Sequence, residues 1–198
     1  MTKEPSEDSR LSRLINQASE GATPSVEVVQ PQAESNRTPP LTVVTAVIAA
    51  LQAHGVVAAV GGSGLLAALG LINQVRDWDV SCDAPTETVE AALHSTGLRY
   101  TRAVAGDGQH ATRARFAVVA EDHEVDVLVG FAIRDGGHVI PLPTRITSRW
   151  RGLPMADPTV WLTAYRLLGR HQRADCLDAW LDESTGSSAP VVSQEPSA

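Results

Sequence analysis

The sequence predicts a domain of the α/β (α+β) class, with a mixed β-sheet that is flanked by helices and followed by C-terminal helices. Residues 41–94 contain apolar runs in the order helix, strand, helix, strand, helix. Residues 100–142 are short alternating segments separated by Gly and Asp turns, which is typical of hairpins. Asp157 and Pro158 then start a helical end, because they combine a capping side chain with proline at the first helical position.

The first half of the folded region carries the most apolar elements. Residues 41–53 are apolar on nearly every face and predict a buried helix that ends at Gly55. Residues 56–60 are a short β-branched run between glycines, which predicts a buried strand. After a glycine-rich turn we expect a short helix over 65–71, a strand over 76–82, and a helix over 85–94 that is capped by Thr86 and closed by Gly97.

The second half predicts hairpins and two helices. Residues 100–105 and 111–120 flank a turn at Gly106–Gly108 and predict an antiparallel pair. A turn at Glu121 and Asp122 leads into a strand over 123–133, and a turn at Asp135–Gly137 leads into a strand over 138–142. The final helices are expected over about 158–168 and 172–181.

The two ends of the sequence differ in composition from the middle. Residues 1–38 are rich in Ser, Glu, Pro, Gln and Thr, and residues 184–198 repeat this composition. Such segments lack the apolar surface that a packed structure needs. We therefore expect disordered tails at both ends and one folded domain over 39–183.

Charge and hydropathy exclude some classes of partner. The 198 residues include 23 Asp and Glu against 16 Lys and Arg, a net charge of −7, which argues against a protein that coats DNA or binds a membrane surface through basic residues. The 38–75 segment has no charged side chain, but prolines, glycines and polar residues interrupt it, so no membrane span is expected. Arg accounts for all basic residues except Lys3, and its planar donors suit phosphate and carboxylate groups.

The cysteines and the N-terminus indicate a cytoplasmic protein. Cys82 and Cys176 form no CxxC pair, which argues against a disulfide scaffold and a zinc ribbon. Both are expected to be small core residues. The N-terminal residues lack the apolar segment of a secretory signal.

Three acids form the main chemical signal. Asp77 and Asp79 are two residues apart on a predicted strand, so their carboxylates share a face, repel each other and need a cation or Arg partners. Asp126 lies between two valines of another predicted strand, and Glu124 shares its face. Oxygen ligands of this kind suit Mg²⁺, which shares its coordination shell with substrate phosphates.

A glycine-rich turn precedes the first two acids. Gly61, Gly62 and Ser63 follow a predicted strand and open a helix. Glycines let backbone N–H groups approach a phosphate closely, and a helix N-terminus favours anions.

These motifs resemble those of the DNA polymerase β-like nucleotidyltransferase superfamily. The match comprises Gly62-Ser63, then Asp77-Trp78-Asp79, then Asp126, and it covers residues 45–130 well. The resemblance implies the nucleotidyltransferase fold, as in small bacterial members that act as toxins or on antibiotics. Many of those members carry a Lys or Arg and a further Asp in their terminal helices, and the nearest equivalents here are Arg170, Arg173, Asp175 and Asp178.

The resemblance also implies a reaction and its residues. Asp77, Asp79 and Asp126 would be catalytic and would bind two Mg²⁺ ions, while Gly61, Gly62, Ser63 and Arg76 would bind a nucleoside triphosphate such as ATP. NMP would be transferred to a hydroxyl acceptor and pyrophosphate released. The acceptor is left open among RNA such as tRNA, protein, and small molecules such as antibiotics.

Several other interpretations stay open. A non-catalytic domain of the same fold would bind nucleotide or a partner protein. A Rossmann domain would use Gly62-x-Gly64-x-x-Ala67 to bind a dinucleotide, although charges at 76, 77 and 79 are unusual for its buried second strand. Asp77 and Asp79 could instead pair with Arg113 and Arg115. His123 adjoins the acids, and a basic groove could be lined by Arg145, Arg149, Arg151, Arg166, Arg170 and Arg173.

Overall fold

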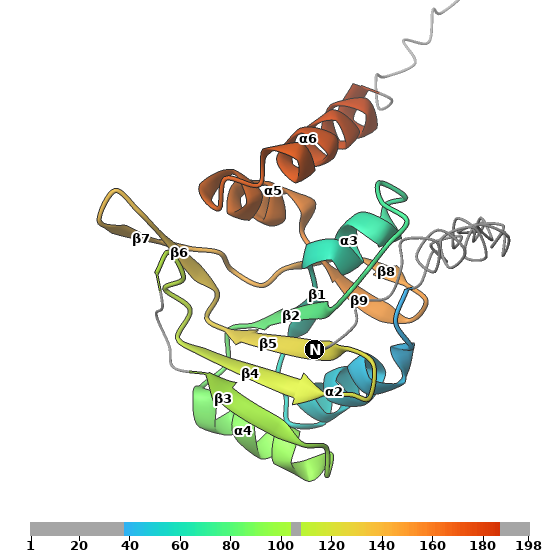
Figure 1. Cartoon of the computed structure of the whole chain (residues 1–198), viewed down its shortest axis with the longest axis vertical. Helices are drawn as coiled ribbons and strands as arrows, with labels where there is room; N and C mark the ends of the chain where they lie inside the picture. Colours follow the sequence, from blue (N-terminus) through green and yellow to red (C-terminus); the bar gives the residue numbers. More distant parts are fainter. Residues whose placement is uncertain (1–37, 104–107, 187–198) are drawn as a thin grey trace, which may run out of the picture. The chain divides into compact units, whose positions relative to one another are not determined.

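The computed structural model describes residues 38–103 and 108–186, all within one unit that comprises residues 36–198 (Figure 1). Most of both predicted tails and most of the turn at Gly106–Gly108 lie outside these ranges. Helix α6 continues to Gly186, past the predicted domain boundary at residue 183.

A mixed seven-stranded sheet forms the centre of the described part. Its strand order is β3-β4-β5-β2-β1-β9-β8. Strand β2 is parallel to β5 and antiparallel to β1, and β1 is parallel to β9. The strands are β1 (Ala58–Val60), β2 (Trp78–Cys82), β3 (Tyr100–Ala103), β4 (Ala114–Val119), β5 (Glu124–Val129), β8 (Ile146–Trp150) and β9 (Leu153–Ala156). A separate ribbon pairs β6 (Ala132–Asp135) with β7 (His138–Pro141).

Helices flank this sheet and follow it, so the predicted fold class is confirmed. Helix α2 packs against α4, and Figure 1 shows both on the same side of the sheet. Helix α3 begins directly after β1, and the C-terminal helices α5 and α6 pack against each other. The helices are α2 (Leu41–Ala53), α3 (Gly62–Ala68), α4 (Thr86–Ser95), α5 (Pro158–Leu167) and α6 (His171–Gly186).

The core explains why α2 forms where its sequence predicts. Val44, Val47, Ile48 and Leu51 recur at helical spacing, and all four are buried. Gly55 follows the helix with a φ of 73°, a left-handed conformation in which the absence of a Cβ avoids strain. The helix and its predicted end are therefore confirmed.

Alternation along the central strands divides the sheet into two faces. In β2, Trp78 and Val80 are fully buried, whereas Asp79 between them is partly exposed. In β5, Val125 and Val127 are buried on either side of the partly exposed Asp126. Because neighbouring residues on a strand point to opposite faces, one face is apolar core and the other carries the acids.

Several predicted boundaries were wrong, each for a local reason. The strand expected over 123–133 is broken at Gly130, whose φ of 59° turns the chain from β5 into β6. Thr86 is the first residue of α4 and not its cap, because Pro85 holds that place without a side-chain hydrogen bond. In contrast, Asp157 caps α5 as expected, since its Oδ1 accepts a hydrogen bond of 2.9 Å from the Thr159 N–H.

Residues 146–156 form a hairpin for which there was no prediction from the sequence. Its strand β9 pairs with β8 and with the central strand β1. The cysteine prediction holds for Cys82, which is buried, and fails for Cys176, which is exposed. Within the described residues, every helix is too short or too polar to span a membrane.

Candidate active site

The site is built around two acids on adjacent parallel strands. Asp79 on β2 is the register partner of Asp126 on β5. Paired residues in neighbouring strands project to the same face, and neighbouring strands lie about 4.8 Å apart. The structure therefore places these two carboxylates side by side, as the sequence predicted.

Asp77 lies at the entrance to β2 and not on the strand itself. Its side chain is exposed, and the strand begins one residue later at Trp78. Its backbone carbonyl accepts a hydrogen bond of 3.3 Å from the Ser63 hydroxyl. The charge of Asp77 still reaches Asp79, because it contributes to raising the pKa of that carboxyl. The prediction that the strand includes Asp77 was wrong, but the two acids are close enough to interact.

The glycine turn is bound directly to the acidic strand. The Gly61 N–H donates to the Asp79 carbonyl over 2.8 Å. Gly62 has a φ of 54°, and a Cβ at this position would overlap the Asp79 carboxylate. Both features require glycine here. The turn between β1 and α3 therefore covers Asp79 with backbone alone.

Helix α5 also packs against this turn. A Cβ at Gly61 would overlap the indole of Trp161, so the helix packs onto the bare backbone. Trp161 also contacts Tyr165, with ring centroids 5.9 Å apart, and Phe131, with centroids 5.3 Å apart. This role of Trp161 was not predicted, because nothing in the local sequence pattern of α5 distinguishes it from an ordinary core aromatic.

The environment of Asp79 disfavours its charged form. Burial is the main cause, and the charges of Asp126 and Asp77 add to it, so the pKa of Asp79 rises from 3.8 to about 6. Arg170 and Arg173 oppose this rise. These two arginines, which open α6, are therefore close enough to the acids to interact electrostatically.

Asp126 bonds Arg115, an arginine that the alternative interpretation paired with Asp77 and Asp79. Arg115 on β4 donates from Nε to Oδ1 over 2.9 Å and from Nη2 to Oδ2 over 2.7 Å. The alternative of Arg113 and Arg115 pairing with Asp77 and Asp79 is therefore not what the structure has. Arg113 instead donates to the Ala84 carbonyl over 3.3 Å. The sequence therefore indicated correctly that an arginine of this strand pairs with an acid, but it did not identify Asp126 as that acid.

The remaining candidates from the terminal helices are two exposed acids and an arginine that packs on a buried tyrosine. Asp178 pairs with Arg166 over 2.7 Å, an exposed link between α6 and α5, and Asp175 is exposed. Arg173 lies over the ring of Tyr165, with its Cζ 5.9 Å from the centroid. Tyr165 is fully buried, and its pKa is raised chiefly by burial.

Other residues singled out in the sequence lie away from the acid pair or at its edge. His123 is buried, with its Nδ1 2.7 Å from Oδ1 of Asp122. Glu124 and Arg76 are exposed. Three arginines of the predicted groove are exposed at the other edge of the sheet: Arg145 just before β8, Arg149 in β8, and Arg151 in the turn that follows it.

Two observations bear on the remaining alternatives. Strands β1 and β2 are antiparallel, whereas a dinucleotide-binding unit needs them parallel, so the Rossmann interpretation was wrong. In the described parts of the chain, no three His, Cys, Asp or Glu side chains come together closely enough to ligate a metal ion. The bidentate contact of Arg115 with Asp126 accords with this finding, since it takes both oxygens of one of the acids.

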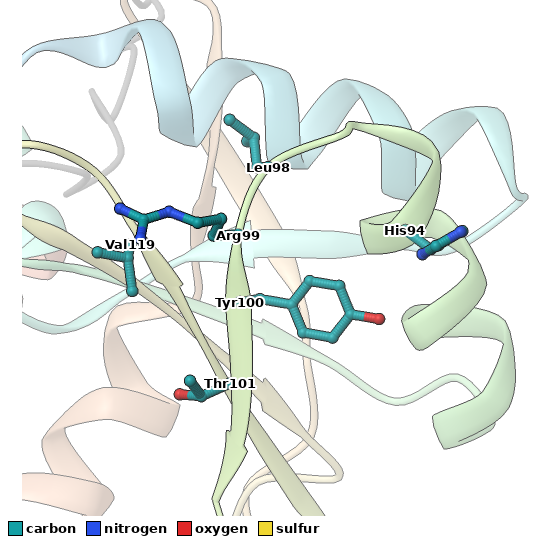
Figure 2. Close-up of a pocket in the computed structure, with 6 residues that line it drawn as sticks. All are labelled: His94, Leu98, Arg99, Tyr100, Thr101 and Val119. Atoms are coloured by element: carbon teal, nitrogen blue, oxygen red, sulfur yellow. The ribbon is translucent and has the colours of Figure 1, made fainter.

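An open hollow of about 510 Å³ lies elsewhere, between the end of α4 and β3 (Figure 2). The Tyr100 ring points toward the helix that carries His94. None of the predicted site residues lines this hollow. It is lined by His94, Leu98, Arg99, Tyr100, Thr101 and Val119.

Comparisons with known proteins return nucleotidyltransferases. No protein-family model and no curated protein match the chain. The structure is similar to a crystal structure of a candidate nucleotidyltransferase from Thermotoga maritima, with 22% identity, a TM-score of 0.49, and coverage of 72% of this chain and 92% of that one.

Two structures of the antibiotic-resistance factor ANT(2'')-Ia, a nucleotidyltransferase, are also similar. Each has 14% identity and a TM-score of 0.41; they cover 74% and 73% of this chain, and 91% and 98% of their own. One of them is in complex with adenylyl-2''-tobramycin. At these identities and TM-scores the likeness concerns the fold and not the activity.

Proposed function

We propose that this chain transfers a nucleotide from a nucleoside triphosphate to a hydroxyl acceptor, with Mg²⁺ bound and pyrophosphate released. The observation that carries the proposal is the side-by-side placement of Asp79 and Asp126, with the bare backbone of Gly62 against the Asp79 carboxylate. An acid pair next to a glycine turn provides places for a cation and for phosphates.

The residues present fit a hard divalent cation. Asp79 and Asp126 offer carboxylate oxygens on neighbouring strands, and Mg²⁺ needs only one or two protein carboxylates because substrate phosphates and water complete its coordination shell. Asp77 would join them as a third ligand on binding. The Gly62 position leaves no side chain between the turn and the Asp79 carboxylate. When bound, a pair of such ions neutralises charge on the attacking and leaving oxygens of an in-line displacement.

The chain's own groups would bind and orient the substrates. Backbone N–H groups at Gly62 and Ser63 would hold the β- and γ-phosphates, with Gly61 fixing the turn to β2. Arg76 lies exposed beside Asp77 and would contact the nucleotide. Asp126 would help to activate the acceptor hydroxyl, because its carboxylate would attract the hydroxyl proton.

The compartment follows from the same proposal. Nucleoside triphosphates are cytoplasmic substrates, and an exposed free Cys176 suits a reducing environment. We therefore propose a cytoplasmic enzyme.

Transfer of labelled nucleotide tests the proposal. The full chain would be incubated with each α-labelled NTP, Mg²⁺ and three acceptor pools: total RNA with tRNA, protein, and small hydroxyl compounds such as aminoglycosides. We expect label in one pool, lost with EDTA and in Asp79→Asn. Glu87→Gln, an exposed carboxylate on α4, is the matched control and should keep activity. No transfer, or equal transfer by Asp79→Asn, contradicts the proposal.

A second candidate function is nucleotide binding without catalysis. It is favoured by Arg115, which holds both oxygens of Asp126. Calorimetry with ATP separates the two functions. Binding that is the same with and without Mg²⁺, together with no transfer, would favour the binding domain, whereas metal-dependent binding favours the enzyme.

A further inference from the structure

Arg115 places a positive charge at the acid pair. It bonds both carboxylate oxygens of Asp126 in a parallel, fork-like arrangement. Such bidentate, charge-assisted pairs are among the stronger hydrogen bonds of proteins. The oxygens that Arg115 holds are the ones that a divalent cation would need.

The sheet register explains why this pair forms. Ala117 on β4 is the register partner of Asp126, and Arg115 lies two residues before Ala117 on the same face. The Arg115 side chain therefore reaches Asp126 diagonally across neighbouring strands. This placement is set by the backbone and not by a flexible loop.

The two partners differ in their freedom to move. The Asp126 side chain is 14% exposed, whereas that of Arg115 is 48% exposed. Asp126 has a short side chain on an inner strand, but the Arg115 guanidinium can turn into water without leaving a cavity. Release of the pair would therefore leave Asp126 in place.

The neighbouring acids favour a charged guanidinium next to Asp126 when no metal is bound. The carboxylates of Asp126, Asp79 and Glu124 all stabilise its charged form. Arg170 and Arg173 add further positive charge near Asp79. A divalent cation entering this site would meet the guanidinium as a competitor of like charge.

We propose that Arg115 is an internal counter-ion that holds Asp126 until a divalent cation binds, and that it competes with that cation for the Asp126 carboxylate. The inference rests on the metal site of the proposed function. Arg115 is in this view a positioning residue, because it acts through Asp126. Cation binding requires its two hydrogen bonds to break, so removing it raises metal affinity.

Titration with Mn²⁺ tests this, with free Mn²⁺ measured by electron paramagnetic resonance and no nucleotide present. We expect Arg115→Gln to bind Mn²⁺ about three- to tenfold more tightly than the unmodified chain, which is the size of effect expected from one charge-assisted pair. Arg113→Gln is the matched control: it removes the same charge two residues earlier from a side chain bonded to a backbone carbonyl. Its affinity should change much less.

A lysine variant keeps the test decisive if Arg115→Gln does not fold. Lysine retains the charge but cannot bond both oxygens in a fork, so Arg115→Lys should bind Mn²⁺ with intermediate affinity. Equal or weaker binding by the folded variants overturns the role of Arg115 and leaves the proposed function standing. If the unmodified chain and both variants bind no Mn²⁺, the proposed metal site fails and this inference with it.

Discussion

The two faces of the seven-stranded sheet are made by alternate residues of the same strands, yet they have opposite character. On one face, Val80 of β2 and Val127 of β5 are fully buried. On the other, Asp79 and Asp126 lie beside each other, and Arg115 of the neighbouring strand bonds Asp126. The same backbone hydrogen bonds therefore fix both the core and the site. The core face holds the acids in register.

The two faces also act on stability with opposite sign. Apolar burial stabilises the fold, by about 25 cal/mol for each Å² removed from water. The acid pair does the reverse, because burial and neighbouring negative charge raise the pKa of Asp79 to about 6. Substitutions that exchange the character of the faces should therefore give effects of very different size.

The largest effect is expected from a carboxylate on the apolar face. Val127→Asp would bury a charge with no partner, and we expect a loss of about 4 kcal/mol or more in the free energy of unfolding, enough to unfold many domains. The matched change on the other face, Asp126→Val, should alter stability by only about 1 kcal/mol, because Arg115 is half-exposed and can turn into water. Denaturant unfolding followed by circular dichroism measures both. Equal losses would contradict the division into two faces.

The glycine turn over the acidic face should be the next most sensitive point. Gly62→Ala combines a left-handed φ with an overlap between the new Cβ and the Asp79 carboxylate, and we expect it to destabilise by about 3 kcal/mol. Gly70→Ala is the matched control, since its φ of 76° is also left-handed but its Cβ would meet open space. The control should lose about 1 kcal/mol. The difference between the two, measured by urea unfolding, reports contact with Asp79.

Features of the fold and the candidate site could be predicted where they depend on a short stretch of sequence. The alternation of Asp79 and Asp126 with buried residues identified their shared chemistry, since side-chain direction follows from a period of two. Gly62 was predicted to lie in a turn that opens a helix after a strand, and α3 does begin there after β1. The candidate site residues that the sequence indicates are those whose local pattern departs from an apolar strand.

The rest depended on pairing between distant segments. Strand β9 lies beside β1 although nearly a hundred residues separate them, and its sequence, Leu153–Ala156, carries no alternation that marks it. The partner of Arg115 was likewise decided by the register of β4 against β5. Register between strands is set by the whole sheet, so a sequence segment read alone does not contain it.

The pH dependence of stability tests whether the acidic face destabilises the fold when Asp79 is ionised. Ionised Asp79 destabilises the fold because its folded-state pKa of about 6 exceeds the ordinary 3.8. The penalty is absent below about pH 4, grows as pH rises toward 6, and is complete above it, where it amounts to at most about 3 kcal/mol. Asp79→Asn removes the charge and should be more stable than the unmodified chain by about 2 kcal/mol near pH 8 in EDTA, and equal to it near pH 4. Thermal unfolding at both pH values is the measurement. If the variant is less stable than the unmodified chain near pH 8, other interactions stabilise ionised Asp79 and the prediction is wrong.

The smallest effect should come from an ion pair that lies outside both faces. Arg166 and Asp178 join α5 to α6 over 2.7 Å, but their side chains are 57% and 45% exposed. Water screens such a pair, so Asp178→Asn should change the free energy of unfolding by about 0.5 kcal/mol or less. Arg115→Gln, in metal-free buffer, should lose about 1 kcal/mol, because Asp126 is only 14% exposed and loses two hydrogen bonds. Unfolding at low and high salt separates the two, since the exposed pair should lose its contribution at high salt while the Arg115 pair keeps part of its own. If both pairs respond alike, the acidic face is no more desolvated than the outer surface of the helices.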